Sequence, residues 1–431
     1  MMRGEKKIGR MNEAWQQYHR GNLDGAGAAA ARVQSLGGKG IGGALFLQGL
    51  VAEQAGEHSV AENFYRAAIS FNPNKWRFHA CLGLLLRRFS RNPAGALPKG
   101  AIDEAAVEIS RAAKLAAAAK DGGGKLAVTT CIFAARECKD VHEAEGILRD
   151  ALANLKSDQK LVAQLHYALG KLMKRSGKKN AAADAYRACL QSDPGHELAR
   201  YKLAALQGGS STLNGAPVKY VRALYDGYAE KFDQSLMRLK YSTPQLLADM
   251  LRTSPCSFRH CLDLGCGTGL SGLAFAPIAE RIHGVDLSSK MLLKAQERQI
   301  YYHLAEMGIV EYMEQHSQDK DAVRFDLFIC ADVLPYFGDI GSVLEQARTC
   351  AAPSAFFLLS TEALISDLAS AEVSGVHFRL KETGRFQHSK KYIEKAALAA
   401  GWKVVSTKQA TLRQNKNLPV IGNLFMLQLL E

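Results

Sequence analysis

The chain has 431 residues, 47% of them apolar, with 11 prolines and a formal net charge of +13. This length exceeds one ordinary hydrophobic core, so two or three domains are expected, and the composition excludes a disordered or collagen-like chain. No apolar run reaches the length of a membrane span, and residues 1–10 lack the apolar core of a secretory signal. We therefore expect a soluble, cytoplasmic protein with no membrane partner.

The positive charge is concentrated in the first half of the chain. Residues 1–210 contain 31 Lys and Arg against 19 Asp and Glu, a net +12, whereas residues 211–431 are nearly neutral. A basic surface can attract nucleic acid or an acidic protein, but a lysine-rich solvated helical surface has the same composition. Because no aromatic residues are interleaved for base stacking, nucleic acid is not an expected partner.

The 9 cysteines are scattered, with no Cys-x-x-Cys pair and no Cys/His group at zinc spacing. This usage favours reduced thiols and predicts no metal site.

From Met11 to about Leu206 the sequence is helical, alanine-rich and internally repetitive. Small residues at fixed offsets let two helices pack closely, a second glycine turns the chain, and a proline ends the second helix. Two segments share these offsets: Gly49, Gly56, Ala61, Tyr65, Ala68 and Pro73 in one, and Gly170, Gly177, Ala182, Tyr186, Cys189 and Pro194 in the other. A third copy is expected from Trp76, with a loop inserted at residues 91–98, and a degenerate copy over residues 125–156.

These offsets resemble the tetratricopeptide repeat, a 34-residue helix pair. The resemblance implies an all-α helical solenoid over residues 1–206, with a concave surface that binds a protein or peptide. The alternative is a module that serves only packing or dimerisation.

Residues 207–217 are rich in glycine and serine without periodicity, which predicts a linker. Residues 218–431 then form the second domain, an α/β fold in which strands and helices alternate. Strands are expected near residues 260–264, 281–285, 301–305, 325–330 and 355–360. A final hairpin near residues 402–412 and 423–430 predicts a mostly parallel, Rossmann-like sheet with one antiparallel strand.

The most informative motif is an acid followed by three glycines, Asp263-x-Gly265-x-Gly267-x-Gly269, after an apolar strand. A turn this tight leaves no side chains between backbone and ligand, so an adenosine-bearing cofactor can lie against it. Asp286 ends the next strand and can accept hydrogen bonds from ribose hydroxyls. Met291 offers an apolar surface for adenine, and Glu306 can accept the adenine amino group. The predicted cofactor-binding residues here are Asp263, Gly265, Cys266, Gly267, Gly269, Asp286, Leu287, Met291, Glu306 and Asp332.

Three motifs, in order, resemble those of class I S-adenosylmethionine-dependent methyltransferases: residues 263–269, residues 284–288 and residues 325–336. The resemblance covers roughly residues 220–431 and implies S-adenosylmethionine as the cofactor. A closer resemblance is to the bacterial tetratricopeptide-repeat-containing methyltransferases, which share residues 224–233 and 384–389. In these relatives the entry helix covers the cofactor, which implies that Tyr225, Tyr228 and Phe232 also contact it.

Methyl transfer from a sulfonium mainly requires in-line alignment of donor and acceptor, with a base only where the acceptor loses a proton. Asp332, Tyr336 and His388 are the candidates beside the acceptor; His388 equally suits a structural hydrogen bond. The favoured acceptor is a protein or peptide recruited by the repeats. The alternatives are a small molecule, such as a quinone, lipid or natural-product intermediate, and a catalytically silent scaffold.

Overall fold

The computed structural model describes residues 2–37, 40–89, 101–117, 124–138, 140–155, 158–208, 213–251, 257–364, 377–415 and 417–431. The chain divides into two compact units, residues 1–199 and 200–431. This division falls inside a helix, ahead of the linker expected at residues 207–217, so the domain bounds given above stay a prediction. Among the described residues, none of the helices is long and apolar enough to cross a membrane.

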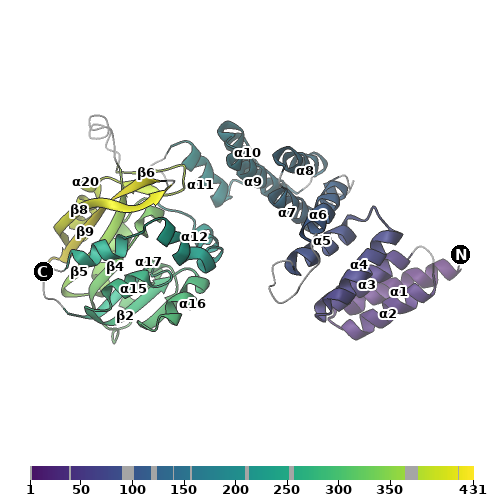
Figure 1. The fold of residues 1–431 in the computed structure, drawn as a ribbon, viewed down its shortest axis with the longest axis horizontal. Helices are drawn as coiled ribbons and strands as arrows, with labels where there is room; N and C mark the ends of the chain where they lie inside the picture. The colour runs from purple at the N-terminus through teal and green to yellow at the C-terminus, as the bar shows by residue number, and fades with distance from the viewer. Residues whose placement is uncertain are drawn as a thin grey trace. The chain divides into compact units, whose positions relative to one another are not determined.

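The first unit consists of helices that pack in consecutive pairs (Figure 1). Their bounds are α1 Met2–His19, α2 Leu23–Ser35, α3 Ile41–Gln54, α4 His58–Phe71, α5 Trp76–Phe89, α6 Ala101–Ala117, α7 Gly124–Glu137, α8 Val141–Asn154, α9 Gln159–Arg175, α10 Lys179–Ser192 and α11 Glu197–Leu206. The loop expected at residues 91–98 lies outside the described residues.

The packing confirms the role of the repeated small residues. A Cβ added at Gly49 would lie 2.5 Å from the Tyr65 ring, and one at Gly170 would lie equally close to Tyr186. Gly56 adopts φ +80, and its counterpart in the second segment also has a positive φ. The glycine therefore lets the tyrosine pack flat against the partner helix, and the positive φ turns the chain between the two helices.

The second unit is built on a nine-stranded sheet. Its strands are β1 Phe258–Leu264, β2 Ala279–Asp286, β3 Tyr301–Glu306, β4 Phe325–Cys330, β5 Ala351–Ala363, β6 Phe378–Leu380, β7 Phe386–His388, β8 Trp402–Asn415 and β9 Leu418–Leu429. Strands β3-β2-β1-β4-β5 are parallel, and β9 pairs antiparallel with β5 and β8, forming the yellow hairpin of Figure 1. The predicted alternation of strands and helices and the mixed sheet are confirmed.

Helices cover both faces of this sheet because its buried strands alternate their side chains between two apolar clusters. Helices α17 (Ile309–Gln318), α18 (Gly341–Cys350) and α20 (Lys390–Ala399) pack on one face. Helices α14 (Thr243–Asp249) and α15 (Leu270–Phe275) pack on the other. Within β4, Phe328 faces the first cluster and Leu327 the second. Helix α16 (Ser289–Glu297) follows β2, and the Ser288 hydroxyl caps it by accepting the Met291 N–H.

The β6–β7 hairpin was not predicted, and its placement follows from the pairing of β5. Glu362 pairs with Gly422 of β9 and with Gln387 of β7, so these two strands lie on opposite edges of β5. Strand β4 pairs with β5 only as far as Leu359. The hairpin therefore continues the sheet beyond the carboxyl end of β4, which is the edge where parallel α/β sheets bind ligands.

Candidate active site

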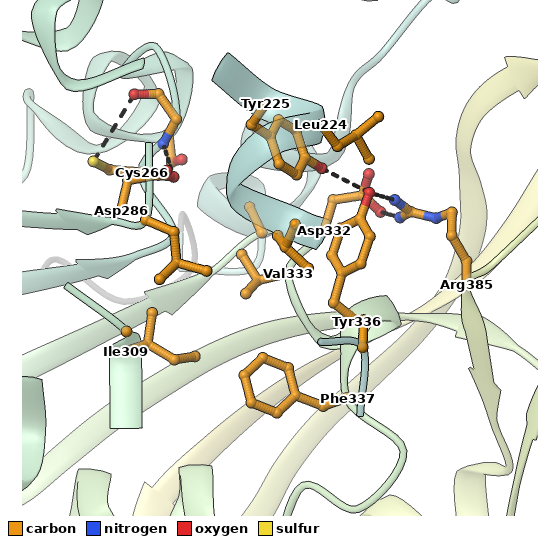
Figure 2. Close-up of a pocket in the computed structure, with 18 of the residues that line it drawn as sticks. Leu224, Tyr225, Cys266, Asp286, Ile309, Asp332, Val333, Tyr336, Phe337 and Arg385 are labelled. Atoms are coloured by element: carbon orange, nitrogen blue, oxygen red, sulfur yellow. Dashed lines mark hydrogen bonds and ion pairs between the residues drawn. The ribbon is translucent and has the colours of Figure 1, made fainter. Parts of the chain in front are cut away.

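One cavity of about 930 Å3 lies at the carboxyl edge of the sheet, entirely within the second unit (Figure 2). Its walls come from the glycine turn after β1, the ends of β2 and β4, the start of α17 and the segment 214–241. Arg385, in the turn before β7, and Arg413 of β8 complete them. Five carboxylates and two guanidinium groups line it: Asp286, Glu311, Glu314, Asp332, Asp339, Arg385 and Arg413. The excess of negative charge favours a cationic ligand.

At one end of the cavity, the glycine turn leaves its backbone open to a ligand. Gly265 and Gly267 have φ +71 and +55, conformations that other residues rarely adopt. A Cβ at Gly265 would lie 2.4 Å from the Val333 side chain, whereas one at Gly267 would meet nothing closer than the Phe232 ring at 3.8 Å. Gly265 thus permits close packing of the loop after β4. Gly267 leaves the backbone of the turn open to the cavity.

Asp286 lies beside this turn with its carboxylate fixed by backbone donors. One oxygen accepts the Gly267 N–H at 3.0 Å, and the other accepts the Ser288 N–H at 2.8 Å. Burial raises the pKa of Asp286 above its ordinary value, although these backbone hydrogen bonds oppose the shift. Each carboxylate oxygen keeps a further lone pair, so the group can also accept hydrogen bonds from two adjacent hydroxyls of a ligand.

The apolar wall next to Asp286 is formed by Leu287, Ile309 and Val310. Two residues predicted to contact adenine lie elsewhere. Met291 is fully buried, because its side of α16 faces the core, and Glu306 is exposed at the end of β3. Neither residue lines the cavity, whereas the apolar start of α17 does.

Asp263 lies beneath the glycine turn and also does not line the cavity. It is fully buried and accepts a hydrogen bond from the Tyr301 hydroxyl at 2.7 Å. Burial raises the pKa of Asp263 to about 7, and the nearby Asp286 carboxylate adds to the shift against the opposing effect of Tyr301. The geometry therefore gives Asp263 a supporting role, joining the turn to strand β3. Gly269, at φ +89, packs on Arg298 and Tyr301 and likewise does not line the cavity.

The predicted aromatic stripe lines the cavity but does not lie on one helix. Helix α12 (Val218–Asp226) ends before Gly227, a 3-10 turn covers Ala229–Lys231, and α13 (Phe232–Arg238) follows. Tyr225 belongs to α12, Tyr228 to the link before the 3-10 turn and Phe232 to α13, and all three line the cavity. The Phe232 ring meets each tyrosine ring edge to face, with centroids 5.7–5.9 Å apart.

Two polar contacts hold this segment over the glycine turn. The Ser288 hydroxyl donates to Asp226 at 2.6 Å, and the Thr268 hydroxyl donates to Asp233 at 2.5 Å. Arg298 adds an ion pair to Asp233 at 2.6 Å.

The other end of the cavity contains a paired group of charges. Asp332, at the end of β4, has φ +64, a conformation that costs energy for any residue but glycine. Its carboxylate accepts hydrogen bonds from Arg385 at 2.8 Å and from Arg413 at 3.0 Å. Both guanidiniums also bind the buried Glu362 carboxylate. Burial alone would raise the pKa of Glu362, but the two arginines hold it below its ordinary value. The four groups, Asp332, Glu362, Arg385 and Arg413, thus form a charge-neutral wall.

Tyr336 joins this wall to the aromatic segment. Its hydroxyl oxygen accepts hydrogen bonds from the Tyr225 hydroxyl at 3.0 Å and from Arg385 at 3.1 Å, as Figure 2 shows. With both donors directed at the oxygen, the hydrogen of Tyr336 is left to donate to a ligand.

His388 has a structural position rather than one in the cavity wall. It is fully buried, and its Nε2 lies 2.9 Å from the Phe337 carbonyl oxygen and 3.1 Å from that of Gly338. Burial lowers its pKa to about 4. His388 therefore holds the loop after β4 and does not reach a ligand in the cavity.

The structure brings together most of the predicted cofactor residues: Gly265, Cys266, Gly267, Asp286, Leu287, Asp332, Tyr225, Tyr228 and Phe232 line one cavity with Tyr336. Arg385, Arg413, Val333 and Ile309 line it as well, and the sequence did not single them out. Arg385 lies in the stretch 384–389 noted above, so that signal was available. Arg413 had no local signal.

Two family models match parts of the chain. One, described as a methyltransferase domain, matches residues 262–357, and one for the tetratricopeptide repeat matches residues 43–75 and 163–196. Similar curated proteins include ubiquinone biosynthesis O-methyltransferases. The one from Ralstonia nicotianae is 26% identical over 175 residues, covering 39% of this chain and 71% of the relative. The one from Thiobacillus denitrificans is 30% identical over 151 residues, covering 34% and 63%.

The match thus spans about two thirds of the length of these relatives. Among solved structures, a Burkholderia thailandensis 1,6-didemethyltoxoflavin-N1-methyltransferase is 15% identical, with a TM-score of 0.39, over 52% of this chain and 94% of that one. These matches show tetratricopeptide repeats in the helical region and a methyltransferase domain, of the S-adenosylmethionine-dependent kind, in the second unit.

Proposed function

We propose that the enzyme transfers the methyl group of S-adenosylmethionine to a hydroxyl group of a small aromatic acceptor. The observation that carries this proposal is the continuity of the cavity, which joins the glycine turn and Asp286 at one end to the wall of Tyr225, Tyr336 and Arg385 at the other. Its volume of about 930 Å3 is near the upper end for small-molecule sites and leaves room for two ligands side by side.

The residues at the first end suit S-adenosylmethionine. The Asp286 carboxylate accepts hydrogen bonds from the ribose hydroxyls, and Leu287 and Ile309 contact the adenine. The open approach at Gly267 lets the ligand lie against the backbone. The acidic lining attracts the sulfonium cation. The bound cofactor supplies an activated methyl group, and the task of this chain is then alignment of the acceptor.

The residues at the second end suit an uncharged, hydroxylated aromatic ring. Tyr225 and Phe337 supply apolar surface, and Tyr336 donates a hydrogen bond to the acceptor oxygen. The guanidiniums of Arg385 and Arg413 are already neutralised by carboxylates, so they do not require an anionic acceptor. Similarity to O-methyltransferases of ubiquinone biosynthesis supports the same acceptor class.

In this reaction the acceptor oxygen attacks the methyl carbon, the sulfur–methyl bond breaks, and the sulfur keeps the electron pair. The acceptor proton passes to water. Asp332 holds both arginines with its carboxylate oxygens, so we assign it to ordering the wall and not to removing the proton.

The test uses methyl-labelled S-adenosylmethionine and a catechol as acceptor, with the full chain. We expect labelled catechol ether from the wild type. Arg385→Gln removes one partner of the buried Glu362 carboxylate, and breaking a buried pair costs about 3–5 kcal/mol of stability. Because this disorders the wall, we expect kcat/KM to fall at least tenfold. Arg379→Gln is the matched control, since Arg379 lies on the same hairpin but is exposed and outside the cavity. Equal kcat/KM in the two variants would contradict the placement of the acceptor.

A protein or peptide acceptor, recruited by the repeats, is the second candidate. The observation that favours it is the pair of repeat matches at residues 43–75 and 163–196, because such helix pairs present binding surfaces for other proteins. Incubating the enzyme and labelled cofactor with a cell extract separates the two proposals. Label in the protein fraction alone would favour this second acceptor, and label in the small-molecule fraction favours the first.

A further inference from the structure

Helix α11 ends the helical region, yet its second half belongs to a small apolar cluster of the methyltransferase unit. Tyr201 and Ala205 of this helix pack with Leu380 of β6 and Phe386 of β7. Tyr201 is 1% exposed, and the other three side chains are fully buried. The cluster therefore joins α11 to the β6–β7 hairpin, which lies beyond the end of β4 at the acceptor end of the cavity.

The Tyr201 hydroxyl makes one defined contact inside this cluster. It donates to the Gly384 carbonyl oxygen at 2.7 Å. That carbonyl belongs to the peptide bond between Gly384 and Arg385, in the turn where Lys381 N–H donates to the Arg385 carbonyl and Gly384 has φ +79. Because a peptide group is planar, fixing its oxygen fixes the orientation of the backbone from which the Arg385 side chain extends.

Arg385 in turn contacts three other members of the acceptor wall. Its guanidinium binds Asp332, Glu362 and the Tyr336 hydroxyl at 2.6–3.1 Å. A tilt of the Gly384–Arg385 peptide moves the root of this side chain, and three hydrogen bonds with fixed geometry cannot all adapt. The ring of Tyr201 alone would fill the apolar cluster, so the hydroxyl is the part of the side chain that acts on the turn.

We propose that Tyr201 is a positioning residue for methyl transfer, acting through the Gly384 carbonyl on Arg385 and so on Tyr336. This rests on the proposed function, because it assigns the wall around Arg385 to the acceptor. It also means that helix α11, which follows the second matched repeat, takes part in ordering the acceptor site.

The experiment uses Tyr201→Phe in the full chain, which keeps the ring and removes only the hydroxyl. We expect unchanged affinity for S-adenosylmethionine in calorimetry and about tenfold lower kcat/KM for the catechol acceptor, in line with a buried carbonyl that loses its partner. Tyr186→Phe is the matched control, since Tyr186 is equally buried but packs on Gly170 within the repeats. The proposal would be overturned if Tyr201→Phe lost affinity for the cofactor, or if its kcat/KM equalled that of the wild type.

A double-mutant cycle separates positioning from general loosening. If Tyr201 acts through Arg385, then Tyr201→Phe reduces kcat/KM tenfold in the wild type and by less than twofold in Arg385→Gln. Additive losses would overturn the proposal.

A readout without an acceptor keeps this inference apart from the proposed function. In protein labelled with ¹⁵N-arginine, the Arg385 Nε–H donates to Glu362 at 2.6 Å and gives an assignable NMR signal, identified by its loss in Arg385→Gln. We expect Tyr201→Phe to shift this signal and Tyr186→Phe to leave it in place. An unshifted signal in Tyr201→Phe contradicts the positioning role, whereas a wild type inactive toward catechols with a shifted signal contradicts only the acceptor assignment.

Discussion

The raised pKa of Asp263 predicts an unusual pH dependence of stability. Burial lifts this pKa from an ordinary value of 3.8 to about 7 in the folded state. The native state therefore holds a proton that the unfolded chain releases, and this contribution to stability is full below pH 4 and is lost as the pH rises towards 7. At 1.36 kcal/mol for each pKa unit, the loss is about 4 kcal/mol. The Asp263→Asn side chain cannot ionise, so the variant does not lose this contribution. Between pH 4 and 8, the unfolding free energy of the variant should therefore rise relative to that of the wild type by up to this amount.

The assay is urea unfolding of the methyltransferase unit at several pH values. Of the 3 tryptophans, only Trp402 lies in this unit, where it is fully buried, so Trp15→Phe and Trp76→Phe in both proteins make its fluorescence specific. His388 is fully buried and, like His283, has a pKa lowered to about 4, so stability is lost as the pH falls below 6.5; this effect is common to both proteins and cancels in the difference. Parallel curves for wild type and Asp263→Asn would refute the reasoning.

Two further predictions concern the cavity and the loop beside it. Asp286→Ala removes the carboxylate that accepts hydrogen bonds from ligand hydroxyls, and Gly267→Val fills the open approach to the backbone. Calorimetry should therefore give at least tenfold weaker binding of S-adenosylmethionine in each variant. Gly56→Val is the control and should bind normally, because Gly56 also has a positive φ but does not line the cavity. His388→Ala should lower the unfolding free energy by about 1–3 kcal/mol through the lost contact to the Phe337 carbonyl, yet leave the pH profile of kcat/KM unshifted; a displaced acid limb would return His388 to the chemistry.

The parts of the site that could be predicted are those whose residues lie within short stretches of the sequence. The glycine turn and Asp286 each follow an apolar strand, and the carboxyl ends of parallel strands meet at one edge, so their meeting required no side-chain geometry. The aromatic residues at 225, 228 and 232 were placed correctly at the cavity, although Gly227 ends α12 and divides them among separate segments.

The remaining parts depend on pairing between distant segments. Arg413 meets Asp332 across 81 residues because β8 is a long strand paired to β9, and no local pattern marks which of its side chains faces the cavity. Met291 was assigned to adenine because its helix follows Asp286, but the side of α16 that carries it faces the core. Which side of a helix faces a ligand is decided by tertiary packing.

The position of Tyr201 also has a consequence for how the two units can be recombined. A fragment that begins at the glycine- and serine-rich stretch 207–217 lacks Tyr201 and Ala205, and so leaves Leu380 and Phe386 without their covering side chains. Weak activity in such a fragment would then report a damaged hairpin and not the loss of a recruited acceptor. Chimeras that exchange repeat arrays should join before residue 197, keeping α11 with the enzyme that it supports.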